Sequence, residues 1–164
     1  MIEKAILMLA LSLLSVNLFA NSDINKVLDT FHRAAANAEQ VLYFDQLDEH
    51  AVFLGTDGTE RWTKKQFAEF VKPYFSIGQG WLYKSRQRNI TLIPTQGNQE
   101  QLAFFDEILD NKNYGECRGS GVLRLTAQGW KILQYNLSIP VPNVIAGDIV
   151  KKITKHHQQT STVD

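Results

Sequence analysis

The sequence predicts an α+β domain in which a few N-terminal helices pack against one curved antiparallel sheet. Two patterns support this prediction. The first part of the chain after the N-terminal segment has apolar residues at helical spacing, and the second part has long stretches in which polar and apolar residues alternate. At 164 residues the chain has room for one hydrophobic core, because single domains mostly contain about 100 to 200 residues. We therefore predict one domain with its helices gathered on one side of the sheet.

The helical part begins soon after the N-terminal segment. Within residues 23–40, Ile24, Leu28 and Phe31 recur at intervals of three and four residues. This spacing is typical of a helix with one buried face. The apolar residues within 41–47 continue the pattern and predict a second, shorter helix.

A buried strand and a third helix are expected next. Residues 51–54 are too short and too apolar to be anything but a buried strand, and the glycines of residues 55–58 end it in a turn. Thr63 is expected to begin a helix, because Gln66 three residues later completes the spacing of a capping box. Pro73 limits the length of this helix.

Long alternating strands fill the second half of the chain. Clusters of Gly, Pro and Asn separate four of them, which predicts a four-stranded antiparallel meander. The predicted strands are residues 81–94, 101–110, 115–126 and 129–139. Strands of this length twist and bend, so the sheet can close partly around the helices and leave a cone with an open mouth. Pro140 and Pro142 end the pairing, and residues 144–153 are expected to form an amphipathic helix.

The N-terminus has the order of features found in secretory signal peptides. Lys4 precedes the apolar run of residues 5–16, and Ala20 supplies a small residue at the cleavage position. The expected organisation is a signal peptide over residues 1–20, one domain over residues 21–155 and a polar tail over residues 156–164. The protein is then exported, periplasmic or secreted, with no stable membrane span after cleavage. The alternative is a retained membrane anchor, but a span needs roughly 20 apolar residues and this run is shorter.

The charge balance argues against nucleic acid as a partner. The chain has 17 Lys and Arg residues and 17 Asp and Glu residues. No excess of positive charge is therefore available to displace the counterions of a polyanion.

Histidine and cysteine give no sign of a metal or cofactor site. The spacing of His, Cys, Asp and Glu does not resemble that of metal ligands, and no glycine-rich phosphate loop is present, so no cofactor is expected. His32 lies beside Arg33 and is expected at the surface of the first helix. Cys117 is the single cysteine and is expected to be a small core residue; intermolecular pairing or nucleophilic chemistry is the alternative.

Five segments share strand patterning, turn glycines and an order along the chain that point to a known family. They are FHRAAANAE at residues 31–39, AVFLGTDGTERWTKKQFAEFVKPYF at 51–75, FFDEILDN at 104–111, YGECRGSGVL at 114–123 and GWKILQYNLSIPVPN at 129–143. Together they resemble the SnoaL-like domain of the nuclear transport factor 2-like superfamily. The resemblance implies a cone-shaped fold that is often dimeric through its sheet, so a homodimer is expected. It also implies a cavity, which some members use for isomerase, cyclase or dehydratase chemistry, although the acid and base pairs of those enzymes have no match here residue by residue.

Two carboxylates and an arginine are expected on neighbouring strands. Asp106 and Glu107 lie on one predicted strand and Arg118 lies on the next. A buried carboxylate needs a cation or several donors to offset its desolvation. If the protein is an enzyme, Asp106 or Glu107 is the candidate general base, with Arg118 and Tyr135 beside it. The alternative is a structural ion pair across the sheet.

Aromatic and polar side chains are expected to line a pocket for a small apolar or amphipathic molecule. Gln134 and Asn136 are predicted to share a strand face with Trp130 and Ile132, and such a mixed face suits a cavity better than a dry core. The candidate ligand-binding residues are Trp62, Tyr74, Trp81, Phe105, Ser120, Gln134 and Asn136. Each of them can instead be a core residue.

The third long strand contains more glycine than an ordinary strand. Gly115, Gly119 and Gly121 weaken pairing and pack nothing against their neighbours. Either the sheet bends at these residues, which we favour, or its backbone closely approaches another group.

Three functions remain open from the sequence. The leading hypothesis is an exported domain that binds a small apolar or amphipathic molecule in its cone. The second is an enzyme that performs proton-transfer chemistry on such a molecule. The third is an association module that binds no ligand.

Overall fold

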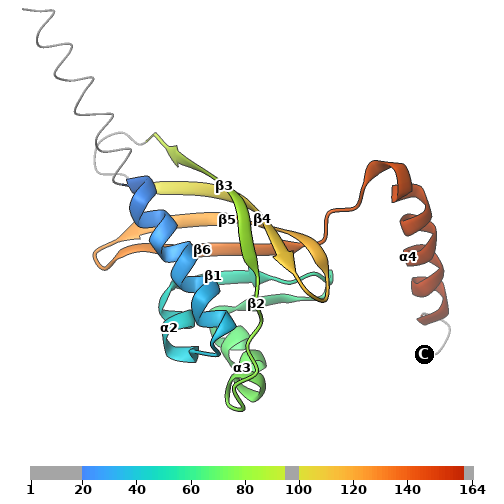
Figure 1. Ribbon diagram of the computed structural model, residues 1–164, viewed down its shortest axis with the longest axis horizontal. Helices are drawn as coiled ribbons and strands as arrows, with labels where there is room; N and C mark the ends of the chain where they lie inside the picture. The colour runs from blue at the N-terminus through green and yellow to red at the C-terminus, as the bar shows by residue number, and fades with distance from the viewer. Residues whose placement is uncertain (1–19, 95–99, 161–164) are drawn as a thin grey trace, which may run out of the picture.

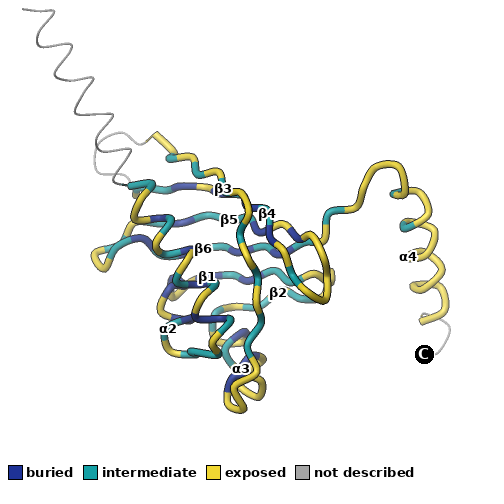
Figure 2. The backbone as a smooth tube through the Cα atoms, viewed as in Figure 1, coloured by how far each residue is buried: buried dark blue, intermediate teal, exposed yellow. Residues whose placement is uncertain are grey.

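A computed structural model describes residues 20–94 and 100–160. Residues 1–19 of the expected signal peptide lie outside the described residues. The first described element is a helix that continues to residue 36 and crosses one face of the sheet (Figure 1). Buried residues lie along the strands and on the inner side of the helices, so the core fills the space between this helix and the sheet (Figure 2).

One sheet of six strands organises the domain, in the order β2-β1-β6-β5-β4-β3. The strands are β1 (Leu47–Leu54), β2 (Arg61–Thr63), β3 (Lys84–Ile93), β4 (Leu102–Asn111), β5 (Gly115–Thr126) and β6 (Gly129–Ser138). All neighbouring strands run antiparallel except β1 and β6, which are parallel. The predicted α+β class and the meander of β3 to β6 are therefore confirmed.

The N-terminal part of the sheet is larger than the sequence predicts. β1 begins at Leu47 rather than at residue 51, and β2 was not expected at all. β2 has three residues and pairs with β1, and the turn between them follows Leu54. A strand this short has too few residues to show alternation, so its pattern is invisible in the sequence.

Two further helices precede the long strands of the sheet, one before β1 and one after β2. The long helix predicted over residues 23–40 ends at residue 36, because Ala38 adopts a left-handed conformation with φ of 56°. α2 (Gln40–Asp45) follows this turn. α3 (Lys64–Phe75) begins with the predicted capping box, in which the Thr63 side chain accepts from the backbone of Gln66.

The last helix stands away from the sheet. A single 3-10 turn, η1 (Asn143–Ile145), leads into α4 (Ala146–Thr160), and no residue of α4 is buried (Figures 1 and 2). The helix predicted over residues 144–153 therefore extends to Thr160, past the start of the expected polar tail at residue 156. No helix within the described ranges is long and apolar enough to cross a membrane.

Candidate functional site

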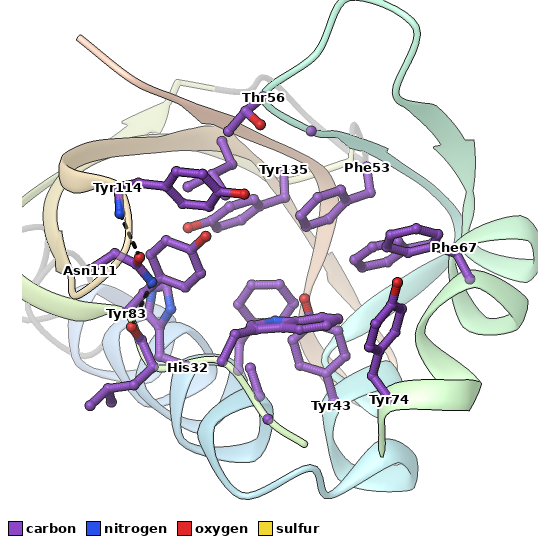
Figure 3. A pocket seen from close by; sticks show the side chains of 18 of the residues that line it. His32, Tyr43, Phe53, Thr56, Phe67, Tyr74, Tyr83, Asn111, Tyr114 and Tyr135 are labelled. Atoms are coloured by element: carbon purple, nitrogen blue, oxygen red, sulfur yellow. Dashed lines mark hydrogen bonds between the residues drawn. The ribbon is translucent and has the colours of Figure 1, made fainter. Parts of the chain in front are cut away.

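An open cavity of about 500 Å³ lies between the helices and the inner face of the sheet. Figure 3 shows the rings of its labelled residues surrounding a central space. Most of the lining side chains are aromatic, and the aliphatic ones are Ala35, Leu82 and Leu137. The walls of the cavity are therefore mainly aromatic.

One wall is a set of stacked rings from the parallel strand pair and α3. β1 and β6 place Phe53 opposite Tyr135, and the centroids of these rings lie 5.5 Å apart. Phe67 of α3 stacks on Phe53 at 3.9 Å, and Trp62 of β2 stacks on Phe70 at 4.8 Å. Stacked rings support one another, so this wall is preorganised.

The facing wall comes from the segment between α3 and β3. Trp81 donates its backbone N–H to the carbonyl oxygen of Ala35 at 3.1 Å, and its side chain hydrogen-bonds Tyr43. A Cβ atom at Gly80 would lie 2.3 Å from the carbonyl oxygen of Ala36, so only glycine allows this close approach to the first helix. Burial raises the pKa of both Tyr43 and Tyr83, so both hydroxyls stay protonated.

A hairpin between β4 and β5 forms one side of the mouth. The Asn111 side-chain oxygen accepts from the backbone nitrogens of Asn113 at 2.9 Å and Tyr114 at 3.0 Å. Its amide nitrogen donates to the carbonyl oxygen of Leu82 at 3.0 Å, a contact visible in Figure 3. Asn111 thus fixes the hairpin against the facing wall.

A buried carboxylate lies behind the cavity floor. Glu107 of β4 has no exposed surface, and its Oε1 atom lies 2.6 Å from His32 Nε2 and 3.2 Å from the Tyr135 hydroxyl, which donates to it. Arg88 Nε donates to the other oxygen at 2.9 Å. Arg88 Nη2 also lies 2.9 Å from that oxygen but is not aligned for a hydrogen bond. Of these four residues, His32 and Tyr135 line the cavity.

The neighbours of Glu107 keep it ionised. Burial alone would raise the pKa of its carboxyl group, but the hydrogen bond from His32 and the charge and hydrogen bond of Arg88 outweigh burial and lower that pKa. Burial raises the pKa of Tyr135, and the adjacent charge of Glu107 raises it further. Tyr135 is therefore a neutral donor beside a carboxylate anion.

Arg88 links β3 to the first helix. Its Nη1 atom donates to Asp29 at 2.8 Å and to the side-chain oxygen of Asn25 at 3.0 Å. The Arg88 side chain is only 9% exposed. The carboxylates of Asp29 and Glu107 compensate its buried positive charge. Arg88 thereby holds the helix that carries His32 against the strand that carries Glu107.

Gly119 provides the space for the contact between Tyr135 and Glu107. A Cβ atom at this position would lie 2.3 Å from the Tyr135 hydroxyl and 3.0 Å from Glu107 Oε1. At Gly121 a Cβ atom would lie 1.9 Å from the carbonyl oxygen of Gln134. Close approach of another group, rather than bending alone, therefore explains these two glycines.

The predicted catalytic group is only partly brought together. Glu107 and Tyr135 are in contact, but Arg118 is exposed and lies on the opposite face of the sheet, because the register pairs it with Ile108 and pairs Glu107 with Gly119. The expected pairing of Arg118 with Glu107 is therefore wrong. Asp106 also lies on the opposite face from Glu107 and accepts from Asn89 at 3.0 Å.

The predicted ligand-binding residues also divide between the two faces. Trp62, Tyr74 and Trp81 line the cavity, whereas Phe105 is buried next to Tyr135, with ring centroids 5.8 Å apart. The remaining three predicted residues, Ser120, Gln134 and Asn136, do not line it.

A bulge explains why the mixed strand face was predicted wrongly. The pairing of β5 with β6 shifts between Val122 and Leu123, which pair with Gln134 and Ile132. The extra residue in β6 places Ile132 and Gln134 on opposite faces, although residues two apart normally share one. Asn136 lies two residues after Gln134 and therefore shares the outer face with it. The roles of the predicted residues in binding or catalysis remain predictions.

Two residues that contact Glu107, His32 and Arg88, were not predicted from the sequence to do so. His32 was expected at the surface, but its side chain is 11% exposed and contacts Glu107, so that prediction is wrong. His32 follows the buried Leu28 by four residues, and this spacing places it on the inner face of the helix. Arg88 similarly alternates with Ile90 and Leu92 on the inner face of β3.

Cys117 is a core residue. Its side chain is fully buried and unpaired in the described part of the chain. Burial raises the pKa of the thiol, so it stays protonated and unreactive.

Comparison with known proteins places the fold in a large group. The model of the SnoaL-like domain family matches residues 24–142. No curated protein matches the chain. An NTF2-like protein with a cystatin-like fold from Novosphingobium aromaticivorans superposes with a TM-score of 0.59 and 11% identity, covering 84% of this chain and 93% of that one.

Two further solved structures share the fold. A candidate dehydratase of the NTF2-like family from Streptomyces avermitilis has a TM-score of 0.56 and 11% identity, over 74% of this chain and 96% of its own. Part of Pgp2, a helical cell shape determining protein from Campylobacter jejuni, has a TM-score of 0.53 and 24% identity, over 67% of this chain and 38% of its own. At these identities the likeness concerns the fold alone.

Proposed function

This chain belongs to the SnoaL-like domain family, and from that premise we propose that it is an exported protein that binds a small amphipathic molecule in its aromatic cavity. The cavity itself carries the proposal. Its volume of about 500 Å³ falls within the roughly 300 to 1,000 Å³ of typical small-molecule sites. A protein that served only to associate with another would not need an open cavity of this size.

Phe70 allows a test of ligand binding with a surface control. Phe70 lines the cavity and is 41% exposed, whereas Val41 of α2 is 87% exposed and does not line the cavity. Because both side chains are exposed, neither Phe70→Ala nor Val41→Ala removes a core residue. We expect a compound that co-purifies with the protein from its native source to raise the melting temperature of wild type and of Val41→Ala, but much less that of Phe70→Ala.

This experiment can also reject the proposal. Native mass spectrometry would show whether the purified chain carries a small molecule, and a thermal-shift screen against a broad library would show whether any compound stabilises it. If the protein carries nothing and no compound stabilises it, it does not function as a small-molecule binder.

The contact between His32 and Glu107 favours a second candidate, an enzyme of the isomerase, cyclase or dehydratase type. A histidine that donates one ring N–H to a buried carboxylate leaves its other nitrogen available as a base. His32 lines the cavity, so a bound molecule would lie next to this base. Here His32 is the general base, and Glu107 and Tyr135 are positioning residues.

Proton transfer can be measured without knowing the product. In deuterated water, NMR should show exchange of a carbon-bound hydrogen of the co-purified compound in the presence of wild-type protein. His32→Gln keeps an N–H donor for Glu107 but lacks a basic nitrogen, so exchange should stop while binding persists. His50→Gln is the control, because the His50 side chain is 70% exposed and does not line the cavity. Equal exchange in all three proteins would exclude His32 as the base.

We also propose that two copies associate through the outer sheet face. Phe104 and Ile93 of this face are 47% and 37% exposed, and a monomer would leave them in water. Sedimentation of the purified protein measures the association directly. A monomer at micromolar concentration would contradict the proposal.

A further inference from the structure

The rings of the cavity differ from the lining expected for a hydrocarbon ligand. Flexible acyl chains and sterols pack against Leu, Ile, Val and Met, which adapt to irregular shapes. Here Trp62, Trp81 and Tyr74 contribute rings to the walls, and only three side chains of the lining are aliphatic. The negative face of an aromatic ring attracts polarised C–H groups, so flat walls fit a rigid ring that presents C–H bonds on its face.

Polar side chains at the mouth can bind a ligand with many hydrogen-bonding groups. Gln79, Lys112 and Asn113 line the cavity, and their side chains have no hydrogen bond or ion pair with any other described residue. Glu60 adds a carboxylate to the lining, and its Oε2 atom also accepts from the backbone nitrogen of Asp57 at 3.2 Å. A carboxylate only accepts, an ammonium only donates and an amide does both, so a ligand that satisfies them all must donate and accept at several points, as hydroxyl groups do.

The charges of the rim indicate a neutral ligand. Glu60 and Lys112 carry opposite charges, and the nearby Glu107 is fully buried and compensated by Arg88. A strongly anionic or cationic ligand would meet a like charge at one side of the mouth. A neutral molecule meets none.

Rings continue from the cavity to the surface. Tyr74 is 39% exposed, Phe70 is 41% exposed and Tyr114 is 51% exposed, and all three line the cavity. A ligand that covers these faces must reach beyond the enclosed space. It therefore has more than one ring.

From these four observations we infer that the ligand is a neutral oligosaccharide whose sugar rings stack on the aromatic walls and whose hydroxyl groups bind the polar rim. The inference rests on the proposed function, since it names the class of molecule that the cavity binds. It is distinct from a hydrocarbon ligand and from a planar phenol, which has few hydroxyl groups on its edge.

Calorimetry on the full chain can separate these classes. Three sets of probes are used: neutral oligosaccharides of two to four hexose or N-acetylhexosamine units, hydroxylated aromatic compounds, and fatty acids with a sterol. We expect at least one oligosaccharide to bind and the affinity to rise with the number of rings. Binding of only phenols or only lipids would overturn the inference while the proposed function stands, and binding of no probe together with an empty protein in native mass spectrometry would remove both.

Two variants test the stacking geometry. Tyr74→Phe keeps the ring face and should bind the oligosaccharide within about threefold of wild type, whereas Tyr74→Ala should weaken it about tenfold, the equivalent of one ring contact. Val41→Ala, an exposed substitution in α2 outside the cavity lining, should bind as wild type does. If Tyr74→Ala also binds as wild type does, sugar rings do not stack in this cavity.

Discussion

A single hydrogen atom in place of a side chain, at Gly119, allows the Tyr135 hydroxyl to reach Glu107. In Gly119→Ala the new methyl group would overlap that hydroxyl, which a Cβ atom approaches to 2.3 Å. We expect a loss of about 1 to 3 kcal/mol in the free energy of unfolding, typical of an overpacked core. Urea denaturation measures it. Gly58→Ala is the control, because a Cβ atom there meets nothing within 4 Å, and equal midpoints for the two variants would contradict the packing argument.

Glu107 should make the stability of the protein depend on pH. Glu107→Gln leaves Arg88 and His32 without their buried partner, which costs about 3 to 5 kcal/mol at neutral pH. Since the pKa of Glu107 is lower in the folded than in the unfolded state, its contribution is present above the ordinary carboxyl pKa and disappears as the pH falls through the folded value.

The difference in stability between wild type and Glu107→Gln should therefore shrink below about pH 4. Chemical denaturation of both proteins at a series of pH values measures this difference. The pKa of Asp48 is also lowered, because hydrogen bonds from Arg124 outweigh burial, but Asp48 titrates in both proteins and cancels. A difference that stays constant down to pH 3 would show that Glu107 does not titrate as proposed.

At the scale of residues, the sequence predicts that a buried charge needs a partner of opposite charge. It does not show which side chain is that partner. A buried carboxylate requires a cation, and this reasoning singled out Glu107 and an arginine. The choice of Arg118 over Arg88 failed because it depended on which face of a strand each residue occupies. His32 belongs to an element 75 residues away from Glu107 in the sequence, so no local pattern joins them.

At the scale of elements, local signals were the reliable ones. The capping box at Thr63 needs only the four residues from Thr63 to Gln66, and the structure has it as predicted. The first helix ends because Ala38 adopts a left-handed conformation. Alanine normally favours a helix, so the residue type does not predict this end. The bulge in β6 likewise follows from pairing with β5 and carries no signal of its own.

The capping box should contribute measurably to stability. Thr63→Ala removes the oxygen that accepts from the backbone nitrogen of Gln66 at 3.3 Å. We expect the free energy of unfolding to fall by about 1 kcal/mol. Lys65→Ala, an exposed substitution in the same turn, should change it by less than about 0.5 kcal/mol. Indistinguishable denaturation midpoints for the two variants would mean that the cap is not stabilising.

At the scale of the whole molecule, α4 should be dispensable for folding. None of its residues is buried, and the family match ends at residue 142. A chain that stops after Pro142 should therefore unfold within about 0.5 kcal/mol of the full chain. Circular dichroism during thermal denaturation gives the comparison, and a chain that stops before Leu137, which shortens β6, serves as the destabilised control. A large loss on removing α4 alone would show that it packs against the domain.

The parallel pairing of β1 with β6 has a consequence for the order in which the protein can fold. Phe53 and its partner Tyr135 are separated by most of the domain, and such distant contacts form late because a long loop must close first. A ribosome releases β6 only after every other strand, so during synthesis β1 has no neighbour on that side. The cavity, which needs both strands, cannot exist in a nascent chain. The proposed export would benefit from this delay, because a secretion channel that accepts only unfolded polypeptide would meet a chain that has not yet folded.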